Sequence, residues 1–192
     1  MQLLTKNRSE LLRLFFSNPD RSFFMQEAGR ILGKKPGIFQ RTINKMVDEG
    51  ILESEYRGNA RFFRANKKYP LYRELRSIVF KTVGVKGELK SEINNIKGVQ
   101  FAFIYGSYAK AKEGTLSDVD LLIIGEPDED KLIRRIDAIE KKLQREINYK
   151  VYSLRMIKKD VKNNEPFIVN VLKEKKIMLK GEEDALRKIL EG

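Results

Sequence analysis

Two aspartates separated by a single residue are the residues of this chain best suited to chemistry. Asp118 and Asp120 stand directly before an apolar run, Leu121–Ile124, that predicts a β-strand. Because alternate residues of a strand point to the same face, the two carboxylates converge while Val119 faces the core. Adjacent carboxylates repel each other unless a cation lies between them, and carboxylates together with substrate phosphates are the usual ligands of Mg²⁺. The pair therefore predicts a metal site.

A glycine–serine turn upstream of the aspartates adds a second chemical group. Gly106 and Ser107 end another apolar run, Val99–Tyr105, and a glycine backbone and a serine hydroxyl both suit contact with phosphate oxygens. Lys110 and Lys112 lie between the turn and the aspartates, where they face either a triphosphate or solvent. The combined pattern predicts a site for nucleotide phosphates and a metal.

The segment GSYAKAKEGTLSDVDLLI resembles the GS-x10-DxD signature of the polymerase-β-like nucleotidyltransferases, and in particular their minimal branch. The resemblance implies transfer of a nucleoside monophosphate from a nucleoside triphosphate to a hydroxyl of a protein, RNA or small molecule, with Mg²⁺ or Mn²⁺. It assigns catalysis and metal binding to Asp118 and Asp120, and nucleotide binding to Gly106 and Ser107. It covers residues 98–125 closely and the rest of the C-terminal half loosely.

The third catalytic carboxylate of this family has no direct counterpart in the chain. In the family it lies on the strand after the next helix, helps to hold the metal and acts as the base on the attacking hydroxyl. The equivalent position here is Asn148, whose amide is a neutral ligand that cannot take a proton. Glu146, two residues earlier on the same face, is the alternative third ligand. The sequence therefore predicts nucleotide binding and leaves transferase activity open.

The positive charge of the chain is concentrated in its first half. Of a formal net charge of +12 over 192 residues, residues 1–86 carry +10, from 18 Lys and Arg against 8 Asp and Glu. A basic half joined to a near-neutral half favours a polyanionic partner for the first half. Lysine-rich surfaces also occur in thermophilic proteins, but thermophily does not explain the asymmetry.

The basic half has the element order of a winged helix. Apolar spacing and turn residues predict three helices and a hairpin: 3–16, Phe23–Leu32 capped by Ser22, Pro36–Gly50, and strands Ile51–Tyr56 and Arg61–Ala65. In the third helix, the residues expected to face inward are Ile38, Ile43, Met46 and Val47. This segment resembles the winged helix-turn-helix domains of bacterial and archaeal transcription regulators.

The resemblance implies double-stranded DNA as a partner. In such domains the third helix enters the major groove and the hairpin lies along the DNA backbone. The candidate DNA-binding residues are Gln40, Arg41, Asn44 and Lys45 on the helix and Arg57, Arg61 and Arg64 on the hairpin. Arg suits guanine and Asn or Gln suits adenine, while the hairpin arginines suit phosphates or the minor groove. Contact with RNA or protein is the alternative.

A connecting helix is expected between the two halves. Its apolar residues recur at helical spacing and are Leu71, Leu75, Ile78 and Val79. Winged-helix dimers often pack such a helix against its twin, so a homodimer is one expected assembly. Gly84 and Gly87 mark the expected loosest point. The predicted domains are a winged helix over 1–68, the connecting helix over 69–86 and a nucleotidyltransferase-like domain over 87–192.

The last third of the chain alternates helix and strand signals. Residues 128–145 predict an amphipathic helix whose inward residues are Leu132, Ile133, Ile136, Ile139 and Leu143. The remaining expected elements are a strand over Ile147–Ser153, helices over 154–163 and from about 165, a β-like segment over Lys176–Lys180 and a helix from Glu182. The predicted fold class is therefore α+β, with a mixed sheet flanked by helices in the second domain.

Composition excludes several other classes of protein. The chain has no Cys and no His, which rules out disulfides, thiolate zinc sites and Ser-His triads. No apolar run approaches 18 residues and the N-terminus does not resemble a signal peptide, so we expect a cytoplasmic protein. The favoured function is a DNA-binding transcription regulator whose nucleotidyltransferase-like domain binds nucleoside triphosphate and Mg²⁺. The alternative is an active, antitoxin-like transferase that modifies a protein or small-molecule hydroxyl and uses the winged helix for autoregulation.

Overall fold

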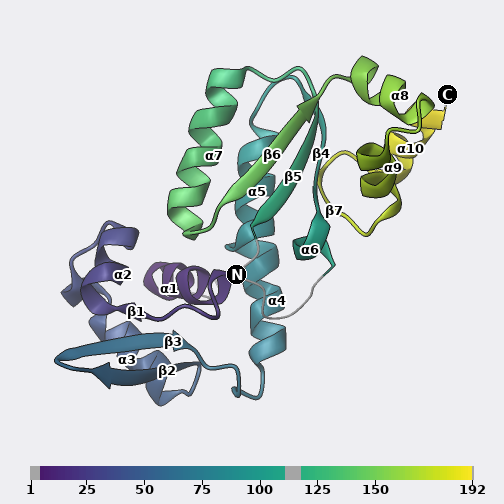
Figure 1. The fold of residues 1–192 in the computed structure, drawn as a ribbon. Coiled ribbons are helices and arrows are strands. Elements are labelled where there is room, and N and C mark those ends of the chain that lie inside the picture. Colours follow the sequence, from purple (N-terminus) through teal and green to yellow (C-terminus); the bar gives the residue numbers. More distant parts are fainter. Residues whose placement is uncertain (1–4, 111–117, 192) are drawn as a thin grey trace. The chain divides into compact units, whose positions relative to one another are not determined.

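The computed structural model describes residues 5–110 and 118–191 and divides into two compact units (Figure 1). One unit comprises residues 1–88 with 141–144, and the other comprises residues 89–140 with 145–192. Both units contain helices and strands, with a four-stranded mixed sheet in the second unit. The predicted α+β fold class is confirmed.

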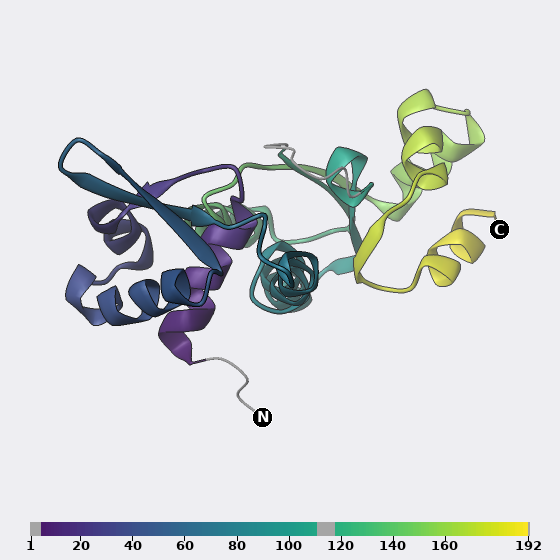
Figure 2. The ribbon, with the colours of Figure 1, turned by 90° about the horizontal axis from the view of Figure 1, so that it is seen from below.

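The first unit combines helices with a three-stranded antiparallel sheet of order β1-β3-β2. Its elements are α1 (Lys6–Ser17), β1 (Phe23–Phe24), α2 (Met25–Leu32), the 3-10 turn η1 (Pro36–Ile38), α3 (Gln40–Asp48), β2 (Leu52–Arg57), β3 (Ala60–Ala65) and α4 (Tyr72–Thr82). Leu11 and Phe15 from α1, Ile43 and Met46 from α3 and Phe63 from β3 share one buried core. Figure 2 shows the hairpin of β2 and β3 extending beyond the helices of its unit.

Three expectations for this unit are corrected by the structure. The second helix begins at Met25 without a side-chain cap, so Ser22 does not cap it, because the two preceding phenylalanines pair with β3 instead. Ile38 is 56% exposed rather than inward, because it lies in the 3-10 turn before α3 begins. Gly84 and Gly87 are sites of close approach, not of looseness: a Cβ on Gly87 would stand 1.7 Å from the carbonyl oxygen of Thr82.

The second unit is built on a sheet of order β6-β5-β4-β7. Its elements are α5 (Val85–Asn94), β4 (Val99–Tyr105), α6 (Gly106–Ala109), β5 (Val119–Gly125), α7 (Glu129–Leu143), β6 (Ile147–Tyr152), α8 (Leu154–Lys162), α9 (Pro166–Lys173), β7 (Ile177–Lys180) and α10 (Glu183–Glu191). β4 runs antiparallel to both β5 and β7, whereas β5 and β6 are parallel and joined by α7. Helix α5 was not predicted from the sequence.

Helices cover both faces of this sheet (Figure 1). On one side α8, α9 and α10 bury Ile157, Ile168 and Leu186 against Phe103 and Leu122 of the sheet. On the other side lies α7, whose Leu132, Ile136, Ile139 and Leu143 are buried. Ile133, expected to face inward, is 53% exposed, because it lies one residue away from the face that these four share.

Across residues 5–110 and 118–191, no helix has the length and apolar composition needed to cross a membrane.

Candidate functional site

The predicted glycine–serine turn lies where β4 ends and the short helix α6 begins. Gly106 has φ +70°, a left-handed conformation that favours glycine. A Cβ at this position would stand 2.5 Å from the Oδ2 atom of Asp120. The backbone angle therefore favours glycine, and a side chain here would push the carboxylate of Asp120 aside. Ser107 follows on the first turn of α6 and is partly exposed.

Strand register brings the aspartates and Asn148 together at one edge of the sheet. Asp120 pairs with Tyr105 on β4 and with Asn148 on the parallel strand β6. Asp118 precedes β5 and accepts a hydrogen bond from Nδ2 of Asn148 at 3.3 Å. Val119 is fully buried, as predicted, whereas Asp118 is exposed and Asp120 partly exposed. The turn, both carboxylates and the amide thus share one edge.

The electrostatics of this edge suit a divalent cation. Burial raises the pKa of Asp120, and the neighbouring carboxylate of Asp118 raises it further. Burial and the charge of Asp120 also raise the pKa of Tyr105. In both groups burial is the larger cause and the neighbouring negative charge the smaller one. Two convergent carboxylates and an amide oxygen are hard oxygen donors, so these residues fit Mg²⁺ or Mn²⁺.

The structure does not bring a third carboxylate to the pair. Among the described residues, no three Asp, Glu, His or Cys side chains are grouped so as to hold a metal. Glu146 is exposed, and its backbone carbonyl accepts a hydrogen bond from the amide of Val119 at 3.0 Å. The side chain that contacts Asp118 in the described part of the chain is the amide of Asn148, and Glu146 stays a predicted alternative ligand.

Cations and aromatic rings near the turn were only partly predicted. Lys110 forms an ion pair with Glu174 at 2.7 Å, while Lys112 lies outside the described residues. The guanidinium of Arg145 lies 5.7 Å from the ring centroid of Tyr108, on α6. Sequence reasoning missed Arg145, although its place just before β6 puts a cation at the edge where the aspartates lie.

Residues 87–184, just over half of the chain, match the family described as polymerase beta, nucleotidyltransferase. The chain belongs to this nucleotidyltransferase family. The match includes the turn, both aspartates and Asn148.

The solved structures that the chain resembles are distant from it in sequence. A mutant of the MntA-HpeT toxin–antitoxin is 12% identical over 55% of this chain and 81% of its own, with a TM-score of 0.39. A toxin–antitoxin structure with AMP-PNP is 14% identical over 55% and 80%, with a TM-score of 0.37. The tri-AMPylated Shewanella oneidensis HEPN toxin in complex with MNT antitoxin is 13% identical over 55% and 81%, with a TM-score of 0.32. No curated protein matches the chain significantly.

The candidate DNA-binding residues of the other unit fall into two groups. Gln40, Arg41 and Lys45 are exposed on α3. Asn44 is partly buried and accepts a hydrogen bond from Nη1 of Arg61 at 3.2 Å, which joins the hairpin to α3.

The hairpin arginines all have partners within the unit. Both Nε and Nη2 of Arg61 donate to the hydroxyl of Ser54, at 3.0 and 2.9 Å. Arg57 pairs with Glu55, and Arg64 pairs with Glu53 at 2.8 Å. Phosphate contact by Arg57 or Arg64 would therefore require exchange of a carboxylate partner, which is inexpensive for exposed pairs.

Proposed function

We propose that the protein is a DNA-binding transcription regulator whose nucleotidyltransferase domain binds a nucleoside triphosphate with Mg²⁺ or Mn²⁺ and has weak or no transferase activity. The observation that carries this proposal is the amide at position 148. It pairs with Asp120 and donates to Asp118, where the family has its third carboxylate. Nucleotide binding needs the turn and the two aspartates, whereas proton removal needs the missing group.

Each residue of the edge has a role in this proposal. Gly106 allows the phosphates to approach the backbone, and the hydroxyl of Ser107 donates to a phosphate oxygen. Asp118 and Asp120 would hold the metal, which when bound neutralises phosphate charge. Asn148 supplies an uncharged oxygen and cannot accept the proton of an attacking hydroxyl. The nucleotide is therefore held and oriented, but this side chain does not activate the attacking hydroxyl of an acceptor.

DNA binding by the first unit is supported by charge and exposure. Gln40, Arg41 and Lys45 present donors from one exposed stretch of α3, the helix before the hairpin. The excess of positive charge in residues 1–86 favours a polyanion. Nucleotide occupancy is proposed to change this DNA affinity, which makes the protein a nucleotide sensor.

An active transferase is the second candidate function. It is supported by membership of the nucleotidyltransferase family and by the convergence of Asp118 and Asp120 beside Gly106. In this case the acceptor is a hydroxyl of a protein or small molecule, and the winged helix serves autoregulation.

Labelled nucleotides distinguish the two candidates. The full chain is incubated with Mg²⁺, cell extract and radiolabelled ATP, CTP, GTP or UTP, and both retained nucleotide and label transfer are measured. We expect one nucleotide to bind without transfer, and binding to be lost in Asp118→Asn/Asp120→Asn. Transfer that disappears in this double variant supports the active enzyme instead. Failure of all four nucleotides to bind contradicts both candidates.

A further inference from the structure

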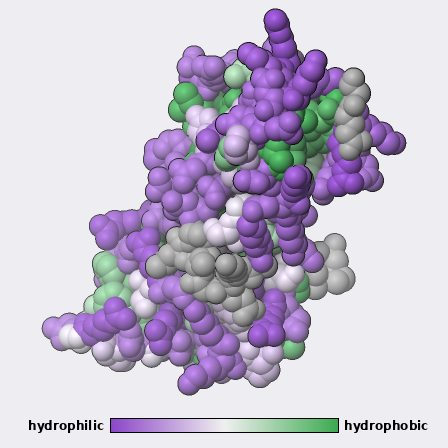
Figure 3. All heavy atoms as spheres, turned by 45° about the vertical axis from the view of Figure 1, so that its right-hand side comes forward, coloured by the Kyte–Doolittle hydropathy of each residue, from purple (hydrophilic) through white to green (hydrophobic). Residues whose placement is uncertain are grey.

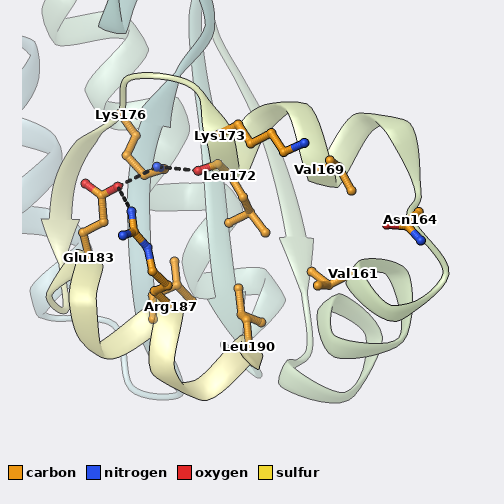
Figure 4. A pocket seen from close by; sticks show the side chains of 10 residues that line it. Val161, Asn164, Val169, Leu172, Lys173, Lys176, Glu183, Arg187 and Leu190 are labelled. Carbon is orange, nitrogen blue, oxygen red and sulfur yellow. Dashed lines mark hydrogen bonds and ion pairs between the residues drawn. The ribbon is translucent and has the colours of Figure 1, made fainter. Parts of the chain in front are cut away.

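A cavity of about 590 Å³ lies among the C-terminal helices of the nucleotidyltransferase domain (Figure 4). Its walls come from α8, α9 and α10 and from the segment before β7. Figure 3 shows hydrophobic surface between hydrophilic side chains in the upper part of the view, where these helices come forward. The volume is within the range of about 300–1,000 Å³ typical of small-molecule sites.

The apolar part of the wall is entirely aliphatic. Five of the ten lining residues are branched aliphatic side chains: Val161, Val169, Leu172, Leu186 and Leu190. None of the ten lining residues is aromatic, so the described wall offers no ring on which a nucleobase could stack. This wall is best suited to binding the flexible hydrocarbon chain of a ligand.

The polar part of the wall is cationic. Lys173, Lys176 and Arg187 stand against a single carboxylate, Glu183, which leaves two net positive charges. The side chain of Lys176 is only 3% exposed, and its ammonium donates to Glu183 and to the carbonyl oxygen of Leu172, each at 2.8 Å (Figure 4). Glu183 is therefore already neutralised, and the remaining two cations lack a matching carboxylate in the lining.

Arg187 is free to change partner. Its guanidinium lies 3.9 Å from Glu183 and its side chain is 64% exposed, a weak pair in water. A guanidinium binds a carboxylate through two parallel hydrogen bonds, which an exposed arginine at the mouth of an apolar cavity can offer to a ligand. Lys173, also exposed, adds a second positive charge.

We propose that this cavity binds an aliphatic carboxylate, with its hydrocarbon chain against the leucines and valines and its carboxylate at Arg187 and Lys173. The site is separate from the nucleotide site, since neither Gly106, Ser107, Asp118, Asp120 nor Asn148 lines it. Volume and the aliphatic wall favour a small ligand over a peptide segment.

Calorimetric titration of the full chain with decanoate tests the proposal. We expect saturable binding of decanoate and little binding of decanol, which has the same chain without the charge. Lys173→Gln/Arg187→Gln should weaken decanoate binding by at least about tenfold, the loss expected for charge-assisted hydrogen bonds. Lys188→Gln, an exposed cation next to Arg187 that does not line the cavity, should leave binding unchanged.

Three results would overturn the proposal: no binding of decanoate, equal binding of decanol, or unchanged affinity in the double variant. Binding of an acidic amphipathic peptide in place of decanoate would also overturn it and assign the cavity to a protein partner. Asp118→Asn/Asp120→Asn should bind decanoate normally, so failure of the nucleotide proposal and failure of this one give different results.

Discussion

At the scale of single residues, the proposed function rests on position 148 of the candidate nucleotide site. The amide of Asn148 lies within hydrogen-bonding distance of Asp118, so a carboxylate there would stand beside the other two. Asn148→Asp should strengthen Mg²⁺ binding and raise label transfer at least about tenfold, since a positioned base contributes about 10²–10⁴ in rate. Both are measured on the full chain, by calorimetry and with labelled nucleotide.

The matched control for this variant is Asn170→Asp, which adds the same charge at an exposed position of α9. It should change neither metal binding nor transfer. An Asn148→Asp protein that binds Mg²⁺ no better than the parent would remove position 148 from the site.

The raised pKa of Asp120 predicts that its ionised carboxylate lowers the stability of the folded protein. The folded state binds the proton of this carboxyl more tightly than the unfolded state, so ionisation above the raised pKa opposes folding. Without metal, Asp120→Asn should raise the free energy of unfolding at pH 7 by up to about 1 kcal/mol. The difference should shrink as the pH falls through the raised pKa and vanish below the usual value of 3.8.

Urea unfolding in metal-free buffer at several pH values measures this effect. Asp130→Asn, an exposed aspartate on α7, serves as the control and should give no gain. A loss of stability in Asp120→Asn at pH 7 would mean that this carboxylate is compensated in the folded protein.

The residue types of the candidate site follow from the sequence, but their partners do not. The alternation of side chains along an extended segment predicts that Asp118 and Asp120 point the same way, although β5 begins only at Val119. The hydrogen bond from Asn148 to Asp118 depends on the register of two parallel strands separated by α7, which no local pattern specifies. The pairing of Arg61 with Asn44 is likewise long-range.

At the scale of elements, the turn between β4 and α6 depends on glycine. Gly106→Ala should displace the carboxylate of Asp120 and strain a left-handed backbone, and so abolish nucleotide binding. The variant should also lose about 1–2 kcal/mol of stability. Gly37→Ala is the control, because a Cβ there meets nothing within 4 Å. Filter binding of labelled nucleotide and urea unfolding measure both effects, and retained nucleotide binding in Gly106→Ala would contradict the expectation.

The ion pair between α1 and Glu49, the residue after α3, makes the first unit sensitive to acid. The hydrogen bond from Arg8 lowers the pKa of Glu49, and the two atoms Nη2 and Oε2 are 2.6 Å apart. Glu49→Gln should cost about 0.2–1 kcal/mol at pH 7. Because the folded pKa is lowered, this contribution is complete above the usual 4.5 and is lost as the pH falls through the lowered value.

Thermal unfolding at pH 7 and at acidic pH measures the loss, with Asp48→Asn as the neighbouring exposed control. An equal loss of stability in Glu49→Gln at both pH values would show that the charge of Glu49 does not stabilise the folded protein.

Most helices and strands were predictable, because the spacing of their apolar residues is that of a helix or of a strand. The strand β1 was not, because its two residues pair only with the distant β3. Helix α5 was missed because Gly84 and Gly87 suggested a linker. In the folded chain these glycines let backbone atoms approach closely. From the sequence alone, a glycine needed for close approach looks the same as a glycine in a flexible linker.

At the scale of the whole molecule, the uneven charge predicts salt-sensitive DNA binding. The full chain should bind a duplex from its own promoter at low salt, with affinity that falls steeply as salt rises. Gln40→Ala/Arg41→Ala should weaken binding by at least about fivefold, since a good base contact is worth about 1–3 kcal/mol. Lys158→Ala, an exposed cation of α8, is the control. Electrophoretic mobility shifts with and without ATP and Mg²⁺ measure the affinity, and an unchanged shift in the double variant would contradict DNA contact by α3.

Helix α9 contributes side chains both to the glycine turn and to the cavity. Phe167 meets the ring of Tyr105, the residue before the glycine turn, with centroids 5.8 Å apart. Val169 and Leu172 line the cavity. If the proposed nucleotide and the proposed aliphatic carboxylate both bind this unit, thermodynamic reciprocity links their affinities. The factor by which the carboxylate changes nucleotide affinity must equal the factor by which the nucleotide changes carboxylate affinity, so either titration measures the coupling between the two sites.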